Sequence, residues 1–257
     1  MLRGLLIAVA LCGLACSSGP GGGDKLAVAA ASSLRFAMGE IETAFEQAHP
    51  AIDLEPTYGS SGAFFAQIES RAPFDVFLSA DADYPQALEA KNLTRGRAFR
   101  YASGRLAVWA GEDSAAVGAV DAAAALGDSA VRHVAIANPR LAPYGRAAEE
   151  ALAHLGLTEA VRDKLVLGDN VAQTLQFAET GAADVALVAE SLLRGSSDAP
   201  EGQSWPLPEG SYAPIAHAGA ILTGAKDPAA AEAFRDFLLS APGQAILARY
   251  GFGPPES

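Results

Sequence analysis

Cysteine is almost absent from this chain of 257 residues, and its two copies, Cys12 and Cys16, both lie close to the N-terminus. The remainder therefore offers no thiol nucleophile and no zinc–thiolate site. Positive charge is also scarce, with 18 Lys and Arg against 30 Asp and Glu and a formal charge of −12. Because clustered positive charge supplies most of the affinity for nucleic acids, this composition excludes a nucleic-acid partner. Aromatic residues are few, whereas half of the residues are hydrophobic, which indicates alanine-rich helices packed on a sheet.

The first 23 residues differ in character from the rest of the chain. Arg3 precedes the apolar run LLIAVALCGLA, which is too short to span a bilayer and has the form of an export signal. The small residues before Cys16 and the flexible stretch after it resemble a bacterial lipoprotein signal, although Gly13 stands where such signals usually have Leu or Val. We predict that 1–23 is a leader and linker. The protein is then exported, either periplasmic or anchored on the extracytoplasmic side of the membrane by a lipid on Cys16, with ordinary signal cleavage as the alternative.

Short apolar runs alternate with helical patterns from residue 25 onward. Buried strands are predicted at 25–32, 52–59, 74–81, 104–111, 132–139 and 212–224. Helices with one apolar stripe are predicted between them, for example at 33–50, 144–157 and 171–182, and a long polar loop at 194–211. This alternation indicates an α/β fold with mostly parallel sheets. In such sheets ligands bind at the carboxyl ends of the strands, where helix N-termini point.

Three of the predicted strand-to-helix turns carry small or hydroxyl residues. They are Ser32-Ser33, Ser60-Ser61-Gly62 and Pro143-Tyr144-Gly145, and a fourth turn, Asp169-Asn170-Val171, also opens a helix. A serine before a helix is ordinarily an N-cap, and each serine pair taken alone has that interpretation. Two serine pairs after two successive strands, together with the free N–H groups of helix N-termini, also form a neutral cradle for an anion.

Enzyme and metal motifs do not fit these turns. A nucleophile elbow of the form G-x-S-x-G fails because residue 63 is Ala, and none of the four histidines has a spacing that identifies a base for Ser61. Asp81 and Asp83 do not continue into a calcium loop, and no phosphate-binding glycine motif is present. We predict no enzyme activity and no cofactor, with a serine hydrolase that uses Ser61 as a minor alternative.

Several segments together resemble the exported molybdate-binding proteins of bacterial ABC transporters. They are AVAAASSL (27–34), YGSSGAFFAQIESRAPFDVFLSAD (58–81), APYGRAAEEAL (142–152), DNVAQTL (169–175) and PGQAILARYGF (242–252). The resemblance covers about 25–253, and the G-S-S-G turn with the string after it is its most specific part. It implies a type II periplasmic-binding-protein fold, in which two α/β lobes are joined by two hinge crossings and close over the ligand. Lobe I would comprise 24–105 and 215–257, and lobe II 106–214.

The resemblance also implies a set of contacts for a molybdate or tungstate ion. Ser33 and Ser61 match hydroxyl ligands of the first lobe, and Ser32 is an additional candidate. Tyr144 and Val171 match positions of the second lobe that offer backbone N–H groups. All of these groups would contact the oxygens of the oxyanion and not the metal atom itself.

One position departs from the pattern of the family. Several relatives have, at the position of Ala189, a Tyr whose hydroxyl reaches the anion, and Ser32 is our candidate to replace it. Whether Ser60 contacts the ligand or only caps a helix stays open at this point. The resemblance further implies a membrane permease and an ATPase as partners of a monomeric receptor. A receptor for sulfate, another oxyanion or ferric ion on the same fold is the alternative.

Overall fold

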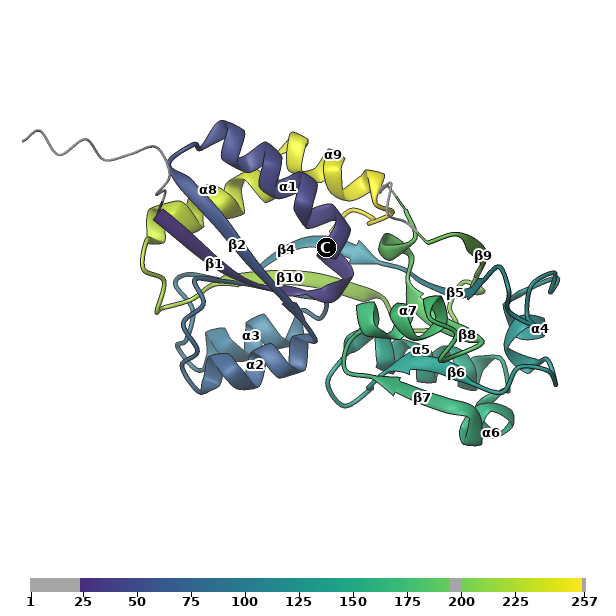
Figure 1. The fold of residues 1–257 in the computed structure, drawn as a ribbon. Helices are drawn as coiled ribbons and strands as arrows, with labels where there is room; N and C mark the ends of the chain where they lie inside the picture. The colour runs from purple at the N-terminus through teal and green to yellow at the C-terminus, as the bar shows by residue number, and fades with distance from the viewer. Residues whose placement is uncertain (1–23, 195–199, 256–257) are drawn as a thin grey trace, which may run out of the picture.

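The computed structural model describes residues 24–194 and 200–255. Two five-stranded sheets, each flanked by helices, make up these residues, which confirms the α/β class (Figure 1). The predicted leader and linker, 1–23, and the predicted lipidation site, Cys16, lie outside the described residues. Among the described residues, no helix combines the length and the hydropathy that crossing a membrane requires.

The first sheet has the strand order β2-β1-β3-β10-β4. Its strands are β1 (Asp24–Ala31), β2 (Ile52–Gly59), β3 (Val76–Ser79), β4 (Phe99–Gly104) and β10 (Ile215–Ile221). β1 pairs in parallel with β2 and β3, whereas β10 runs antiparallel to β3 and to β4. β3 and the part of β1 from Leu26 onward are runs of small or apolar residues because helices cover both faces of the sheet.

The second sheet has the order β7-β6-β8-β5-β9. Its strands are β5 (Leu106–Gly111), β6 (Val134–Ala137), β7 (Leu165–Gly168), β8 (Val185–Ala189) and β9 (Gly202–Pro206). β6 pairs in parallel with β7 and β8, and β5 is antiparallel to β8 and β9. Parallel and antiparallel pairs are thus equally frequent, and the expectation of mostly parallel sheets is wrong. Antiparallel pairs arise beside β5 and β10, the two strands that the chain enters as it passes from one sheet to the other.

Two strands were not expected from the sequence. The predicted strand 104–111 corresponds to β5, which begins at Leu106. β4, at Phe99–Gly104, precedes it and is separated from it by Arg105. β9 lies inside the stretch 194–211 that was predicted as a loop. It forms there because β5 offers an open edge, and the indole of Trp205 is held by a hydrogen bond to the carbonyl of Ala119 at 2.9 Å.

Helices cover both faces of the first sheet (Figure 1). On one face lie α1 (Arg35–Ala48), α8 (Pro228–Leu239) and α9 (Ala241–Arg249), and on the other α2 (Ser61–Glu69) and α3 (Asp83–Ala90). The short helix η1 (Ser32–Leu34) connects β1 to α1. The predicted apolar stripe of α1 is buried, and its Phe45 packs edge-on against Phe234 of α8 with ring centroids 5.3 Å apart.

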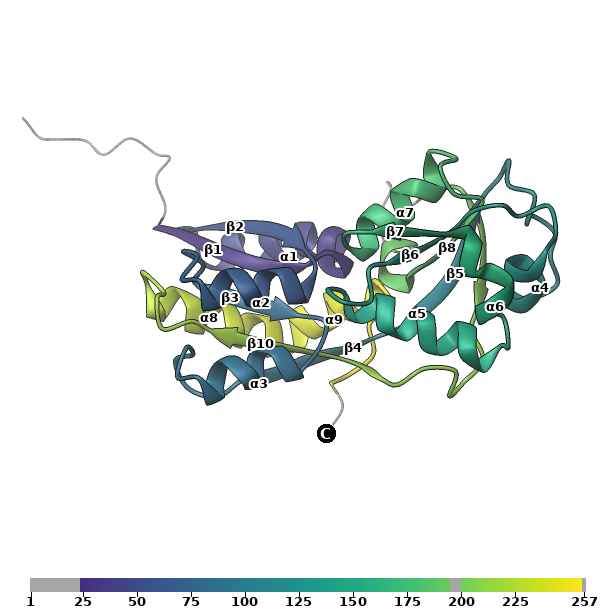
Figure 2. The same cartoon turned by 90° about the horizontal axis from the view of Figure 1, so that it is seen from below.

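The second sheet is likewise enclosed between helices (Figure 2). α7 (Val171–Glu179) lies on one side, and α4 (Ala122–Gly127), α5 (Pro143–His154) and α6 (Thr158–Val161) lie on the other. The short helices η2 (Arg162–Lys164) and η3 (Glu190–Leu192) follow α6 and β8. η3 packs against η1 and α1, so this part of the second half rests on the first.

The chain passes between the two sheets at two places. One is Arg105, between β4 and β5, and the other is the segment 207–214, between β9 and β10 (Figure 2). These are the two crossings of the type II periplasmic-binding-protein fold. The carboxyl ends of β1 and β2 point toward the second sheet, where the turns predicted from the sequence meet (Figure 1).

Candidate anion-binding site

A small cavity lies between the two sheets, where the strand-to-helix turns meet. Small, hydroxyl-bearing and backbone groups from both halves line it: Ala31, Ser32, Ser33, Gly59, Ser60, Ser61, Ala80, Ala142, Pro143, Tyr144 and Val171. The cavity volume is about 10 Å³, roughly what one water molecule requires. A space of this size is too small for a sugar, an amino acid or a peptide. All of the residues predicted to contact an oxyanion are in the lining.

Ser61 is the first residue of α2, directly after the end of β2. Its Oγ accepts a hydrogen bond from the amide of Ala80 at 2.9 Å, and the residue is 1% exposed. Since the amide occupies a lone pair, the hydroxyl hydrogen of Ser61 is available to the cavity. Ser60 occupies the N-cap position, yet its side chain makes no capping hydrogen bond and faces the cavity instead.

Ser32 and Ser33 form the start of η1, and both are buried. The Oγ of Ser32 accepts a hydrogen bond from the amide of Ala172, in the first turn of α7, at 3.3 Å. Ser32 therefore links the first half of the molecule to the second at the wall of the cavity. The Oγ of Ser33 lies 3.2 Å from Nε2 of His217.

The N-termini of two helices supply backbone N–H groups from the other side of the cavity. α5 begins at Pro143, which has no N–H, so the amide of Tyr144 is the first donor of that helix. α7 begins at Val171, and the side chain of Asn170 caps it by accepting hydrogen bonds from two first-turn amides at 3.1 Å each. The amides of Tyr144 and Val171 lie in the first turns, where a helix provides no carbonyl acceptor. Each helix N-terminus also carries partial positive charge.

The side chain of Tyr144 extends behind the cavity to the first crossing. Its phenol oxygen lies so close to Gly104 that any side chain at position 104 would collide with it. Tyr144 is buried, and its hydroxyl forms no well-aligned hydrogen bond within the described residues, although the hydroxyls of Ser33 and Ser191 lie near it. Burial raises the pKa of this phenol, which keeps it protonated and a donor.

His217 is a residue of the site that the sequence did not reveal. It lies in the middle of β10, completely buried, between the rings of Tyr101, Tyr144 and Phe252. Burial lowers the pKa of His217 to about 4, so that the imidazole is neutral at neutral pH. The only signal in the sequence is its place within an apolar strand, which by itself indicates a core position and names no partner.

Several contacts join the two halves around the cavity and hold it closed. The amide of Gly62 donates to the carbonyl of Leu141 at 2.8 Å, and the hydroxyl of Ser191 donates to the carbonyl of Ser33 at 2.7 Å. Arg146 of α5 forms an ion pair with Asp81, which precedes α3. The bond between Ser32 and Ala172 is a further contact between the two halves.

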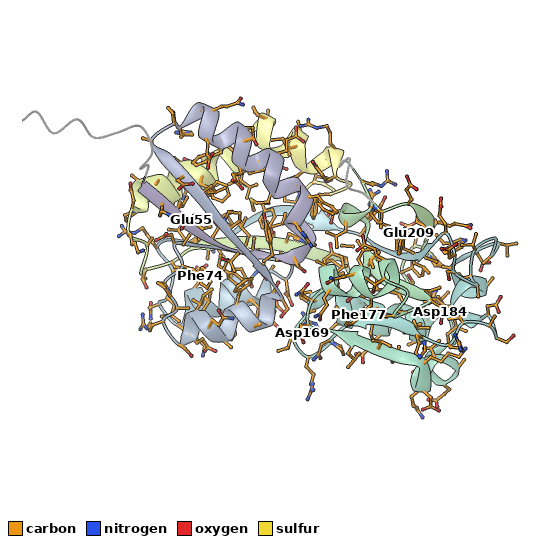
Figure 3. All side chains as sticks on the ribbon, viewed as in Figure 1. Glu55, Phe74, Asp169, Phe177, Asp184 and Glu209 are labelled. Carbon is orange, nitrogen blue, oxygen red and sulfur yellow. The ribbon has the colours of Figure 1, made fainter. Side chains whose placement is uncertain are left out.

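Two positions considered in the sequence do not reach the cavity. Ala189, at the end of β8, is buried and absent from the lining, so nothing at this position takes the place of the Tyr of the relatives. Asp169 lies at the edge of the second sheet that faces the first, and it too is absent from the lining (Figure 3). None of the lining residues carries a charge. The described residues also contain no group of three or more His, Cys, Asp or Glu that would hold a metal ion.

The arrangement favours an anion that only accepts hydrogen bonds. Hydroxyl groups, backbone amides and helix N-termini converge on a closed, neutral cavity between two α/β halves. These features together define a solute-binding receptor of the periplasmic type. Residues 26–253 match the family described as bacterial extracellular solute-binding protein, and the chain belongs to this family.

Comparison with individual proteins narrows the relationship. The molybdate-binding protein ModA of Azotobacter vinelandii is 40% identical to this chain over 233 residues, which cover 89% of this chain and 90% of the relative. The molybdate-binding protein ModA of Rhodobacter capsulatus is 42% identical over 197 residues, or 76% of this chain and 75% of the relative. The solved structure of an Azotobacter vinelandii periplasmic molybdate-binding protein superposes with a TM-score of 0.82 and 30% identity, covering 90% of this chain and all of that one.

Proposed function

We propose that this protein binds molybdate outside the cytoplasm and delivers it to an ABC permease. The observation that carries the proposal is the closed cavity between the two sheets, whose lining offers donors from both halves and contains no charged residue. The similarity to molybdate-binding proteins over nine-tenths of the chain supports the same ligand.

In this proposal the hydroxyl groups of Ser33 and Ser61 contact the anion from the first sheet, and Ser32 adds a third. The backbone amides of Tyr144 and Val171 contact it from the second sheet. All of these contacts go to the oxygens of the anion. Ser60 also lines the cavity and is free of a capping role, which makes it a further candidate contact.

The chemistry of the lining agrees with a dianion that carries no proton near neutral pH. A protonated phosphate would reward a carboxylate acceptor, and the lining contains none. Each hydrogen bond to a charged group contributes about 1.5–3 kcal/mol, and a helix N-terminus up to about 2 kcal/mol in a buried geometry. Several such donors offset much of the cost of removing the ion from water.

We further propose that tungstate, which has the same shape and charge, binds in the same way. The two sheets are then the two lobes, with lobe I at 24–105 and 215–257 and lobe II at 106–214. The leader 1–23 directs export, and Cys16 carries a lipid that anchors an otherwise monomeric receptor. A permease and an ATPase in the membrane accept the ligand from it.

Titration calorimetry of the purified protein with molybdate, tungstate, sulfate and phosphate tests the ligand. We expect molybdate and tungstate to bind far more tightly than sulfate and phosphate. Sulfate or phosphate bound as tightly as molybdate would overturn the assignment. Electrophoretic mobility and mass of the protein from its native membrane decide whether Cys16 carries a lipid.

The variant Ser61→Ala tests the site. It removes a hydroxyl that donates to the anion, so we expect the dissociation constant for molybdate to rise about 10- to 150-fold. Ser70→Ala, just after α2 on the same half of the molecule, is the matched control and should bind as the parent does. Unchanged affinity in Ser61→Ala, with the fold intact by circular dichroism, would contradict the assigned contact.

A further inference from the structure

Three of the four serines that line the cavity, Ser32, Ser33 and Ser61, use their hydroxyl hydrogens differently. Ser61 and Ser32 each accept a hydrogen bond from an amide, at 2.9 Å from Ala80 and 3.3 Å from Ala172. Their hydrogens are thereby left for a ligand. Among the described residues no amide donates to the side chain of Ser33; its Oγ instead lies 3.2 Å from Nε2 of His217, with the phenol of Tyr144 also nearby.

The tautomer of His217 decides the direction of this hydrogen bond. Its Nδ1 lies 3.2 Å from the carbonyl oxygen of Ile215, which only accepts, so Nδ1 carries the hydrogen. Because burial lowers the pKa of His217 to about 4, the ring is neutral and Nε2 has no hydrogen. The hydroxyl of Ser33 must therefore donate to Nε2. Its lone pairs, and not its hydrogen, are then left to face an anion.

The described groups that surround the His217 ring are aromatic, and none of them carries a permanent charge that would hold the ring neutral or protonated. The rings of Tyr101 from β4, Tyr144 from α5 and Phe252 after α9 lie 5.7, 6.0 and 5.2 Å from it between centroids. Burial raises the pKa of both phenols, so both are neutral. The carboxylate of Glu190, on η3, acts on the phenol of Tyr144, and no carboxylate or cation of the described residues shifts the pKa of His217 itself.

We propose that His217 is a positioning residue of the anion site that takes up a proton from solvent when an oxyanion binds. The protonated ring donates from Nδ1 to Ile215 and from Nε2 to the oxygen of Ser33. The hydrogen of the Ser33 hydroxyl, released from Nε2, turns to the anion. This inference rests on the proposed function, because it requires an oxyanion beside Ser33.

Both ways of binding without this proton are unfavourable. If the Ser33 hydroxyl turned to the anion while the ring stayed neutral, Nε2 would become a buried acceptor without a donor. If the hydroxyl kept its bond to Nε2, its lone pairs would face the oxygens of the anion. A proton on the ring gives both Nε2 and the Ser33 hydroxyl a partner, and it places a positive charge near the dianion in an interior where such attraction is strong. Linkage then requires affinity to rise as pH falls toward the pKa of the unliganded ring.

The test is titration calorimetry with molybdate at pH 6.5 in several buffers, none of them an oxyanion, that differ in their enthalpy of ionisation. The dependence of the measured heat on the buffer gives the number of protons taken up with the ligand. We expect about one proton per anion, and an affinity that increases up to tenfold for each unit by which pH falls from 8 to 6. Over this range the dianion itself stays unprotonated, so the proton belongs to the protein.

Two variants assign the proton to His217. In His217→Gln the amide donates to Ser33 without titrating, and in His217→Phe the ring fits the aromatic surroundings without any nitrogen. We expect proton uptake near zero in both, while His154→Gln, at the exposed end of α5, keeps the uptake of the parent. Uptake that persists in a folded His217 variant would overturn the inference.

The parent protein is decisive even if neither variant folds. Molybdate binding without proton uptake overturns the role of His217 and leaves the proposed function standing. Absence of binding to any oxyanion overturns the proposed function and, with it, this inference.

Discussion

Asp75 belongs to the string that carries the family resemblance, yet it lies away from the cavity. Its carboxylate is 1% exposed and accepts hydrogen bonds from the amide of Ala27 at 2.7 Å and from that of Lys226 at 2.8 Å. It therefore joins β1 to the segment before α8, across the end of β3. Hydrogen bonds to an ionised acceptor are stronger than neutral ones, and a buried charge without them would be costly. At the residue scale, then, a distinctive motif contains residues that build the frame as well as residues that face the ligand.

The pKa of His217 has a consequence for the protein without ligand. Its folded-state value, about 4, lies below the ordinary value of 6.5, so below pH 6.5 the unfolded chain binds a proton that the native protein does not. The contribution to stability is complete at higher pH and declines as pH falls from 6.5 to 4. Between pH 7 and pH 5 we expect a loss of about 2 kcal/mol in the free energy of unfolding from this residue.

Urea unfolding of the ligand-free protein at both pH values measures this loss. The variant His217→Gln should lose about 2 kcal/mol less stability than the parent between the two pH values. Because both proteins have the same carboxyl groups, the contribution of those groups cancels in this comparison. His154→Gln should behave as the parent does. An equal loss in the parent and in His217→Gln would contradict this expectation. It would mean that the pKa of His217 is the same in the native and in the unfolded protein.

At the scale of elements, the site depends on where helices begin. α7 begins at Val171 because the side chain of Asn170 accepts hydrogen bonds from the amides of Ala172 and Gln173. Asp227 makes the same pair of bonds at the start of α8, at 2.9 and 3.0 Å, but on the first sheet and away from the cavity. Removing each cap in turn therefore distinguishes an effect on stability from an effect on ligand binding.

We predict that Asn170→Ala lowers both stability and affinity. Loss of an N-cap costs about 0.5–2 kcal/mol, and fraying of the first turn displaces the amide of Val171 that faces the cavity. Asp227→Ala should lower the urea midpoint to a similar degree and leave the affinity for molybdate unchanged. Equal affinities of the two variants in calorimetry would contradict a ligand role for the start of α7.

The sequence predicted local elements well and contacts between distant elements poorly. β2 occupies 52–59 as predicted, because its borders are marked locally by a proline-containing turn and by Gly59. β9 was missed because Gly202–Pro206 has the composition of a loop and becomes a strand only beside β5. Three turns were found from their small and hydroxyl residues and the fourth from its place before a helix, whereas His217 was missed, because its contact with Ser33 spans 184 residues of the chain.

At the scale of the whole molecule, binding and closure are the same event. The net charge of −12 repels an anion at long range, so affinity must come from dipoles that act only when both halves are in place. The bonds of Ser32 to Ala172 and of Gly62 to Leu141 each join the two halves, so we expect them to break when the halves separate. The ion pair between Arg146 and Asp81 adds little by itself, since the Arg146 side chain is 40% exposed.

Gly62 is the position where closure can be blocked without touching a ligand group. A Cβ at this residue would lie 2.8 Å from the carbonyl oxygen of Leu141 and 2.8 Å from the hydroxyl of Tyr84. Leu141 belongs to the opposite half of the molecule, and its backbone is unable to move aside without opening the cavity. Within α2 itself, by contrast, alanine is a better helix residue than glycine. We therefore predict that Gly62→Ala folds normally but binds molybdate about 5- to 150-fold more weakly, as overpacking by about 1–3 kcal/mol implies.

Gly39→Ala is the control for this variant, because Gly39 also lies in a helix, α1, and its added Cβ meets nothing within 4 Å. It should bind as the parent does and unfold at a slightly higher temperature. Small-angle scattering completes the test, since saturating molybdate should compact the parent and Gly39→Ala more than Gly62→Ala. Parent-like affinity and compaction in Gly62→Ala would mean that the two halves need not approach as closely as the bond from Gly62 to Leu141 requires.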